Sequence, residues 1–288
     1  MRIDKNIKKT ISLALAEDSA DSDITSSLLI PENIQIKAKL IAKEPGVLCG
    51  IDIAKAVFKH LDRKVIFRSL KKDGITFRSF EEIASIQGSG PAVLGAERVA
   101  LNFLSFLSAT ATLTRKFLQQ VRGTKVKIMD TRKTIPNLRR LQKYAVLTGG
   151  GMNHRLSLAE AILIKDNHLQ SGCFLNKRRL DTEKLLKLFR RSEKKSLAEI
   201  VVEVENLNEF RQMIKIKPGV IMLDNFSLAD MKTAALYREE HYPAVKLEAS
   251  GGINLANAKK VAKSGVDFIS IGALTHSAPA IDFSLEIR

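Results

Sequence analysis

Residues 200–225, IVVEVENLNEFRQMIKIKPGVIMLDN, contain the pattern that decides the fold: two short apolar runs, Ile200–Val204 and Val220–Leu223, on either side of a helical segment. The same rhythm recurs along the chain, with further apolar runs at Val126–Met129, Ile162–Ile164, Val245–Leu247 and Phe268–Ile271. Short apolar strands that alternate with helices are typical of parallel βα units. The sequence therefore predicts an α/β fold with a C-terminal α/β-barrel of parallel strands.

The first third of the chain has a mixed pattern. Apolar residues recur every four positions from Ile3 to Leu15, which predicts an amphipathic helix. Residues 34–40 alternate between apolar and polar, as a half-buried strand does, and a second helix is expected over residues 51–60. This part is expected to form an α/β sandwich-like domain.

Short strands are expected next, around Val65, Ile75 and Ile83, with Asp73-Gly74 as a hairpin turn. A long helical region follows from Leu94 to Val121, and the Ser and Thr residues in its middle favour a break there. We expect residues 1–110 to form the N-terminal domain, joined by the tail 276–288. Residues 111–275 are expected to form the barrel.

Composition restricts the classes of protein that fit. The net charge of +16 attracts polyanions, but the chain has no Trp and three Tyr, which leaves little for base stacking. We therefore expect no nucleic-acid partner, and part of the charge can serve a small anionic substrate. The two cysteines, Cys49 and Cys173, are too few for a disulfide framework. No secretory or membrane-spanning segment is recognised, so we expect a cytoplasmic protein without a membrane partner.

Positive side chains gather where the predicted strands end. These are Arg132, Lys133, Arg139, His154, Arg155 and Lys165. The carboxyl ends of barrel strands meet at one mouth, where such enzymes build their sites. A cluster of cations repels itself unless an anion fills it, so the sequence predicts a substrate with several negative charges.

Two carboxylates, Glu203 and Asp224, each end an apolar strand beside these cations. They can be structural partners of the cations, or they can hold a hydrated Mg²⁺ or sugar hydroxyls. The spacing alone leaves both readings open. Ser250-Gly251-Gly252 leads into Asn254, a predicted helix N-cap, and with Gly272-Ala273 it predicts a phosphate site of backbone N–H groups.

Several longer motifs carry a resemblance to a known family. They are Glu44-Pro-Gly-Val47, Ala96-Glu97-Arg98, Asp130-Thr-Arg-Lys-Thr134, Lys143-Tyr-Ala-Val146, Gly149-Gly-Gly-Met-Asn-His-Arg155, Leu163-Ile-Lys-Asp-Asn-His168, Leu223-Asp-Asn225, Leu247-Glu-Ala-Ser-Gly-Gly252 and Gly265–Leu274. In this order, over nearly the whole chain, the sequence resembles the quinolinate phosphoribosyltransferases. It departs from the family mildly, with Ser157 in place of a glycine, Glu160 in place of an aspartate and Ala109 in place of a glycine.

The resemblance implies phosphoribosyl transfer from phosphoribosyl pyrophosphate to quinolinate with decarboxylation, a step of NAD biosynthesis that uses Mg²⁺. Arg132, His154, Arg155 and Lys165 would hold the quinolinate carboxylates, with Arg98 supplied by the partner subunit of a homodimer or larger oligomer. Lys133, Glu203 and Asp224 would be catalytic, and the two carboxylates would bind Mg²⁺ directly or through water. The remaining substrate contacts would come from Thr131, Ser250, Gly251, Gly252, Ile271, Gly272 and Ala273.

Three other functions fit parts of the sequence. The nearest is a molybdenum-transport-associated paralogue with the same fold and another substrate. An aldolase-type barrel could use Lys165 or Lys133 as a Schiff-base nucleophile, which borohydride trapping would reveal. A basic nucleic-acid-binding protein would show binding that depends steeply on salt.

Overall fold

The computed structural model describes residues 1, 3–31, 33–172, 175–176, 179–181, 183–184, 187 and 200–288, so Cys173 lies outside the described residues. The chain forms two compact units. Unit 1 comprises Met1–Arg115, Thr134–Gly150 and Leu274–Arg288, and unit 2 comprises Lys116–Lys133 and Gly151–Ala273. The domain boundary expected near residue 110 stays a prediction. Residues 134–150, which lie within the range expected for the barrel, belong to unit 1 in the structure.

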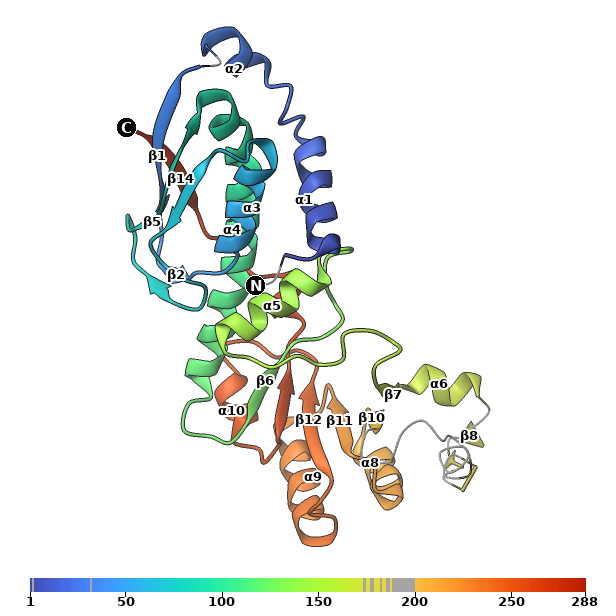
Figure 1. Cartoon of the computed structure of the whole chain (residues 1–288). Helices are drawn as coiled ribbons and strands as arrows, with labels where there is room; N and C mark the ends of the chain where they lie inside the picture. The colour runs from blue at the N-terminus through green and yellow to red at the C-terminus, as the bar shows by residue number, and fades with distance from the viewer. Residues whose placement is uncertain are drawn as a thin grey trace. The chain divides into compact units, whose positions relative to one another are not determined.

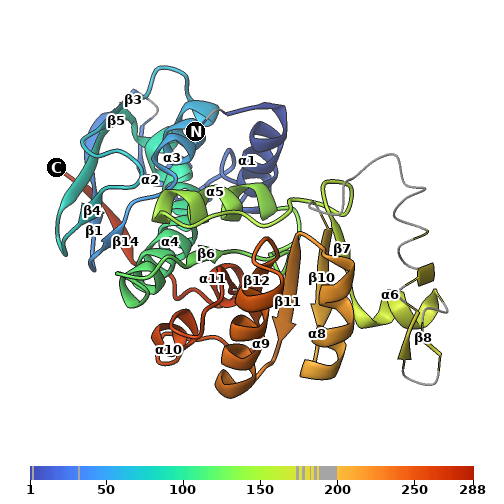
Figure 2. The same cartoon turned by 90° about the horizontal axis from the view of Figure 1, so that it is seen from below.

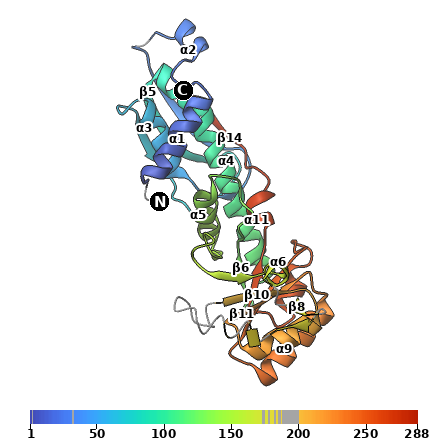
Figure 3. The same cartoon turned by 90° about the vertical axis from the view of Figure 1, so that its right-hand side faces the viewer.

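Unit 1 is built on a four-stranded antiparallel sheet with the strand order β14-β1-β5-β3, and a two-stranded sheet pairs β2 with β4. Strands β14, β1 and β5 of the larger sheet are labelled in Figure 1. The strands of unit 1 are β1 (Gln35–Ala42), β2 (Gly46–Val47), β3 (Ile66–Ser69), β4 (Thr76–Phe77), β5 (Glu82–Ser89) and β14 (Phe283–Ile287). Its helices are α1 (Lys5–Glu17), α2 (Ile24–Leu29), α3 (Ile51–Leu61), α4 (Gly90–Gln120), α5 (Arg139–Gly149) and α11 (Ala273–His276), of which α4 and α11 cross the unit boundary. The helices α1 and α3 lie side by side (Figure 3).

Helix α1 shows how the sequence pattern produces the local structure. The carboxylate of Asp4 accepts hydrogen bonds from the backbone N–H groups of Asn6 and Ile7, and so caps the first turn. The apolar positions Ile7, Ile11 and Leu15 are buried. The helix predicted from this periodicity is confirmed, and so are the strand over residues 34–40 and the helix over residues 51–60.

Helix α4 is continuous over 31 residues, so the break expected at its central Ser and Thr residues is wrong. The hydroxyls of Ser108 and Thr112 accept hydrogen bonds from the backbone N–H groups of Cys49 and Val47, at 3.1 and 2.8 Å. Hydroxyls occupied in this way do not compete with the helical backbone. Length and composition alone would let α4 cross a membrane, but 61% of its most apolar window is buried within the structure. A core helix has the same properties.

The expected hairpin at Asp73-Gly74 is also wrong. Strand β3 pairs with β5 and strand β4 pairs with β2, so the two strands flanking Asp73 do not form a hairpin. The Asp73 carboxylate instead accepts from the backbone N–H of Ile51, at the start of α3, and from the hydroxyl of Tyr144 in α5. The side chain therefore ties separate elements of unit 1 together.

Unit 2 contains a six-stranded parallel sheet with the order β6-β13-β12-β11-β10-β7. Its strands are β6 (Lys127–Met129), β7 (Ile162–Ile164), β10 (Ile200–Val204), β11 (Val220–Asp224), β12 (Lys246–Ser250) and β13 (Phe268–Ser270), beside a separate pair, β8 (Leu175–Asn176) and β9 (Arg179–Leu180). Its helical segments are α6 (Asp166–Ser171), α8 (Leu207–Met213), η2 (Ile214–Ile216), α9 (Leu228–His241) and α10 (Ala258–Ala262). Helix α8 packs against β10 and β11 and lies beside α9 (Figure 2).

All six strands predicted from the apolar runs are present, and their parallel arrangement is confirmed. The predicted α/β class, with a mixed α/β N-terminal part and parallel C-terminal strands, is therefore correct, and the structure adds that the N-terminal sheet is antiparallel. Closure of the six strands into a barrel requires β6 to approach β7. These two strands lie at the ends of the described sheet order, and barrel closure stays a prediction.

Candidate active site

The strand register of unit 2 brings polar side chains to one face of the sheet. Glu203 pairs with Met222, and Asp224, two residues further along β11, pairs with Ser250. Paired residues of parallel strands point to the same face, and side chains alternate along each strand. Glu203, Asp224 and Ser250 therefore share a face at the carboxyl ends of three adjacent strands. This is the edge at which the sequence predicted the site.

Lys165 joins this face through an ion pair. It follows β7 directly, and its Nζ lies 2.5 Å from Oε2 of Glu203. The Glu203 side chain is 12% exposed and that of Lys165 is 44% exposed, so the cation forms the outer partner. The resemblance gave these two residues to different substrates. The structure brings them together, so each balances the charge of the other.

A glycine turn follows β12, and a hydrogen bond links its start to the residue after β11. The backbone N–H of Asn225 donates to the carbonyl of Ser250 at 2.9 Å, and its side-chain amide donates to Asp224 at 2.9 Å. Gly251 has a φ of +89°, and a Cβ there would lie 2.1 Å from Oδ1 of Asn225. Gly252 has a φ of +60°, but its Cβ position faces open space. Only glycine allows the first approach, and the second glycine leaves room beside the turn.

The expected helix N-terminus after this turn begins later than predicted. The Asn254 side chain accepts from the N–H groups of Ala256 and Asn257 and so closes a turn, while α10 begins only at Ala258. The helix is five residues long, so its aligned peptide dipoles are few. Backbone groups of the Ser250–Gly252 turn remain as the candidate phosphate contacts. Ile271, Gly272 and Ala273 directly follow β13, and the N–H of Ile271 is used by the carbonyl of Met129.

Arg132 and Lys133 lie in the loop after β6, and Arg155 lies in the loop before β7. Lys133 is exposed, and its backbone N–H donates to the hydroxyl of Thr131 at 3.0 Å. Arg155 donates from Nη1 to the carbonyl of Ala161 at 2.8 Å, which fixes one edge of its guanidinium. Burial, followed by the neighbouring charge of Arg132, lowers the pKa of Arg155. Two guanidinium groups that repel each other in this way favour an anion between them.

His154 is held by three protein groups. Its backbone N–H donates to the buried carboxylate of Asp130 at 2.9 Å, and its ring Nδ1 accepts from the backbone N–H of Arg155 at 2.8 Å. The ring Nε2 lies 3.6 Å from Oε2 of Glu248, and the two side chains are 8% and 2% exposed. The ring is therefore turned into the protein in this structure. Its predicted contact with a quinolinate carboxylate stays a prediction.

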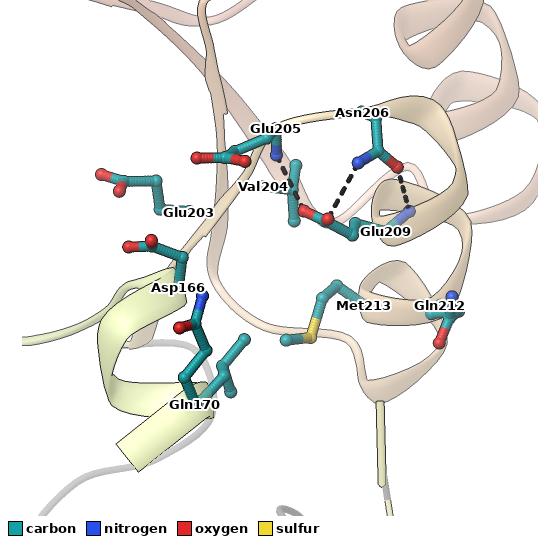
Figure 4. Close-up of a pocket in the computed structure, with 10 residues that line it drawn as sticks. Asp166, Gln170, Glu203, Val204, Glu205, Asn206, Glu209, Gln212 and Met213 are labelled. Atoms are coloured by element: carbon teal, nitrogen blue, oxygen red, sulfur yellow. Dashed lines mark hydrogen bonds between the residues drawn. The ribbon is translucent and has the colours of Figure 1, made fainter. Parts of the chain in front are cut away.

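A second group of carboxylates lies next to Glu203. Figure 4 shows the carboxylates of Asp166, Glu203 and Glu205 pointing to the same side of a pocket of about 340 Å³, while the Glu209 carboxylate accepts hydrogen bonds from the backbone N–H of Glu205 and the side chain of Asn206. Burial first, and then the charges of Glu209, Asp166, Asp224 and Glu203, raise the pKa of Glu205. Within the described part of the chain, no three His, Cys, Asp or Glu side chains are arranged as a complete metal cage. Mg²⁺ does not need such a cage, because it keeps several waters and binds through one or two carboxylates and substrate phosphates.

Two of the sequence-predicted cations belong to unit 1. Arg98 is exposed on α4, and Arg139 donates from Nε to the hydroxyl of Thr134 at 3.0 Å. Burial raises the pKa of Glu97, and the adjacent charge of Arg98 opposes this shift. The amino group of Met1 pairs with Asp52 at 2.8 Å. The role of Arg98 at a neighbouring subunit's site is untested by these contacts.

Sequence reasoning assigned no role to three buried polar residues of this site: Asp130, Glu248 and Ser270. The signal that could have identified Glu248 is a carboxylate inside the apolar run Val245–Ala249, because a buried charge in a strand requires partners. Asp130 similarly follows the apolar residues of β6 directly.

Comparison with known proteins gives a consistent result over the whole chain. Residues 23–108 match the sequence model of the quinolinate phosphoribosyl transferase N-terminal domain, and residues 110–286 match that of the C-terminal domain. The chain is 38% identical over 286 residues to the nicotinate-nucleotide pyrophosphorylase (carboxylating) of Mycobacterium leprae, covering 97% of this chain and 96% of the relative. It is 34% identical over 296 residues to the chloroplastic protein of that name from Arabidopsis thaliana, covering 98% of this chain and 83% of the relative.

Solved structures agree with these relatives. The nicotinate-nucleotide pyrophosphorylase of Francisella tularensis superimposes with a TM-score of 0.87 at 38% identity, covering 98% of this chain and 96% of that one. The corresponding protein of Ehrlichia chaffeensis gives a TM-score of 0.90 at 35% identity, covering 100% of both chains. The antiparallel sheet and the six parallel strands are thus shared with proteins similar in sequence.

Proposed function

The chain belongs to the quinolinate phosphoribosyltransferase family, and on this premise we propose that it converts quinolinate and phosphoribosyl pyrophosphate into nicotinate mononucleotide, CO₂ and pyrophosphate. The observation that carries the proposal is the strand-end face of unit 2. It places Lys165, Glu203, Asp224 and the Ser250–Gly252 turn at one edge of the sheet. Such an edge offers cations for carboxylates, carboxylates for a metal or ribose, and backbone N–H groups for a phosphate.

The quinolinate subsite is proposed to use Arg132, His154, Arg155 and Lys165. Quinolinate carries two carboxylates on a pyridine ring, and each requires charged or hydrogen-bonding partners when it leaves water. Burial and the charge of Arg132 lower the pKa of Arg155 below its usual value, which supports this assignment because a bound dianion would relieve the repulsion. Lys165 would exchange part of its contact with Glu203 for a carboxylate of the substrate.

The phosphoribosyl pyrophosphate subsite is proposed to use Lys133, Glu203 and Asp224, with phosphate contacts from the Ser250–Gly252 turn. Thr131, Ile271, Gly272 and Ala273 are proposed to complete it through backbone groups. Glu203 and Asp224 suit Mg²⁺, because hard carboxylate oxygens on adjacent strands can hold the ion directly or through water. Bound there, Mg²⁺ would neutralise the charge of the pyrophosphate.

The chemistry requires little beyond orientation and fixed charge. The nitrogen of quinolinate forms a bond to C1 of the ribose while the bond from C1 to the pyrophosphate oxygen breaks. Lys133, exposed beside the strand ends, is proposed to stabilise the departing anion. The ring is then a pyridinium, and it accepts the electron pair of the bond to the adjacent carboxylate as CO₂ leaves. That carbon finally takes up a proton.

The test is quinolinate-dependent release of CO₂ and pyrophosphate by the purified protein. Carboxyl-labelled quinolinate gives the CO₂ directly, and a coupled assay gives the pyrophosphate. The Lys133→Ala variant is the matched control, since it should fold normally and lose turnover. If neither product forms with quinolinate and phosphoribosyl pyrophosphate, the proposed reaction is wrong and the paralogue with another substrate becomes the better assignment.

We further propose that the active enzyme is a homodimer or a larger oligomer in which Arg98 acts in trans. The apolar residues of α4 around Arg98 give no support for this interface, because Leu101, Leu104 and Leu107 are buried inside unit 1. Support for the trans role comes from the exposure of Arg98 and from the family motif that contains it. We also propose a cytoplasmic location, with no nucleic-acid or membrane partner, since both substrates are small anions.

Complementation tests the trans role. Arg98→Ala and Lys133→Ala homodimers should each be nearly inactive. A mixed dimer would collect both lesions in one site and leave the other intact, so refolding the two variants together should restore part of the activity. Heterodimers that form and yet recover no activity would place Arg98 in the site of its own subunit.

A further inference from the structure

We infer that Glu248 is a positioning residue of the quinolinate subsite: it orients the ring of His154 and, through this ring, holds the backbone that carries Arg155. The inference rests on the proposed function, since it concerns how the same site recognises quinolinate. It assigns no contact between Glu248 and the substrate, because the residue is 2% exposed.

Glu248 is a buried carboxylate with two polar neighbours. It lies in β12, and its Oε1 accepts a hydrogen bond from the hydroxyl of Ser270 in the adjacent strand β13. Its Oε2 lies 3.6 Å from Nε2 of His154, which is an electrostatic contact rather than a short hydrogen bond. Burying a carboxylate is costly unless it has partners, so Glu248 needs both neighbours. Glu248 is two residues before Ser250 in β12, so the two side chains share one face of the sheet.

The hydrogen bonds of His154 define which ring nitrogen carries the proton. Its Nδ1 accepts from the backbone N–H of Arg155 at 2.8 Å, so Nδ1 carries no proton. The proton of the neutral ring is then on Nε2, the nitrogen that faces Glu248. A carboxylate favours the N–H that points at it. Glu248 therefore stabilises the one tautomer that leaves Nδ1 free to accept from Arg155.

The consequence reaches the substrate through Arg155. Asp130 holds the backbone N–H of His154, and the His154 ring holds the next backbone N–H. Both ends of this short segment are thus fixed by buried groups. The guanidinium of Arg155 is anchored by the carbonyl of Ala161 and lies close enough to Arg132 for the two charges to repel. A small rotation of the segment would move this guanidinium away from the position in which it can share a carboxylate with Arg132.

The test compares two substitutions at Glu248. Glu248→Met keeps approximately the side-chain volume but removes both oxygens, and it should raise the KM for quinolinate about tenfold or more while the KM for phosphoribosyl pyrophosphate stays within about twofold. Glu248→Gln keeps one acceptor oxygen but loses the charge and the second acceptor, so its KM for quinolinate should lie between those of the wild type and Glu248→Met. Ser270→Ala, which withdraws the donor to Oε1, should shift the same constant by a smaller factor. This variant provides the answer if Glu248→Met does not fold.

A second readout follows the ring itself. In ¹⁵N spectra of the histidine side chains, His154 of the wild type should show protonated Nε2 and unprotonated Nδ1. Glu248→Met should shift these signals. Asp267→Asn is the matched control, because it removes a carboxylate just before β13 that binds Lys246 and the backbone N–H of Leu247, at the amino ends of the strands. It should lower thermal stability and leave both the ring signals and the two KM values unchanged.

Failure of the positioning role of Glu248 and failure of the proposed function would give different results in these experiments. Equal increases of both KM values, or a change in thermal stability alone, would overturn the positioning role of Glu248 while quinolinate turnover by the wild type upheld the proposed function. Unchanged ring signals in Glu248→Met would overturn it as well. A folded wild type without quinolinate turnover would instead refute the proposed function, and with it the assignment of Glu248 to a quinolinate subsite.

Discussion

Helix α4 of unit 1 and strands β12 and β13 of unit 2 both bury polar side chains, but they use them differently. In α4, Ser108 and Thr112 are neutral, and each accepts one backbone N–H from a segment packed against the helix. In β12 and β13, Glu248 and Ser270 bind each other, and Glu248 also faces His154. Burying a hydroxyl costs little once it is hydrogen bonded, whereas a buried carboxylate remains costly. At these two places, the neutral buried hydroxyls hold the fold, whereas the buried charge of Glu248 lies on the face of the proposed site.

Removal of divalent metal should give the largest effect, and it should affect unit 2 alone. Glu203 and Asp224 are the proposed ligands, so EDTA is expected to abolish turnover and added Mg²⁺ or Mn²⁺ to restore it. Two carboxylates without substrate phosphates bind Mg²⁺ weakly, so the melting temperature without substrate should change little. Full turnover in metal-free buffer would contradict the proposed role of Glu203 and Asp224 as metal ligands.

Lys165→Ala should come next. Removing one charged partner of a desolvated carboxylate costs about 2–5 kcal/mol, so calorimetric titration should show a far weaker affinity for quinolinate. Affinity for phosphoribosyl pyrophosphate should fall much less, even though Glu203 loses its 2.5 Å partner. Similar losses for the two ligands would show that the ion pair with Glu203, and not the quinolinate contact, is the main role of Lys165.

Alanine substitutions at the two glycines after β12 should separate an effect on stability from an effect on substrate binding. Gly251→Ala forces a Cβ to 2.1 Å from Asn225 at a φ of +89°, so unfolding free energy should fall by about 2–5 kcal/mol. Gly252→Ala places its Cβ in open space at a φ of +60° and should cost only about 1–2 kcal/mol. Its methyl group would occupy the proposed phosphate position, so KM for phosphoribosyl pyrophosphate should rise. Denaturant titration and steady-state kinetics of both variants would show this; equal stability losses would contradict the described turn.

Thr112→Val should have the smallest effect and only on stability. It keeps the shape of the side chain but leaves the buried N–H of Val47 without the hydroxyl that accepts it at 2.8 Å. An unsatisfied buried N–H costs about 1–3 kcal/mol, which urea unfolding would measure. Thr112→Ser retains the acceptor and serves as the control. A change in either KM in Thr112→Val, with Thr112→Ser unaffected, would show that Thr112 influences the site as well as the fold.

The sequence was sufficient for features that local patterns encode. Apolar runs such as Ile200–Val204 identified the parallel strands, because burial on both faces requires continuous hydrophobic residues. The four-residue repeat from Ile3 to Leu15 identified α1. Polar residues after the strands placed the site at their carboxyl ends, and the family motifs gave the chemistry. Local reasoning failed where the partner was distant, as in α4, whose hydroxyls are occupied by backbone groups about sixty residues earlier in the chain.

Only the tertiary structure decided which charges meet. Lys165 and Glu203 are 38 residues apart, and His154 and Glu248 come from different βα units, yet both pairs form because β7 borders β10 and β13 borders both β6 and β12. Sheet order depends on how whole strands pair, and no short stretch of sequence encodes it. The sequence alone was enough to identify which residue types follow each strand. The ion pair of Lys165, the tautomer of His154 and the inward position of Glu248 follow from packing. Burial makes each charge depend on the neighbour that the fold supplies.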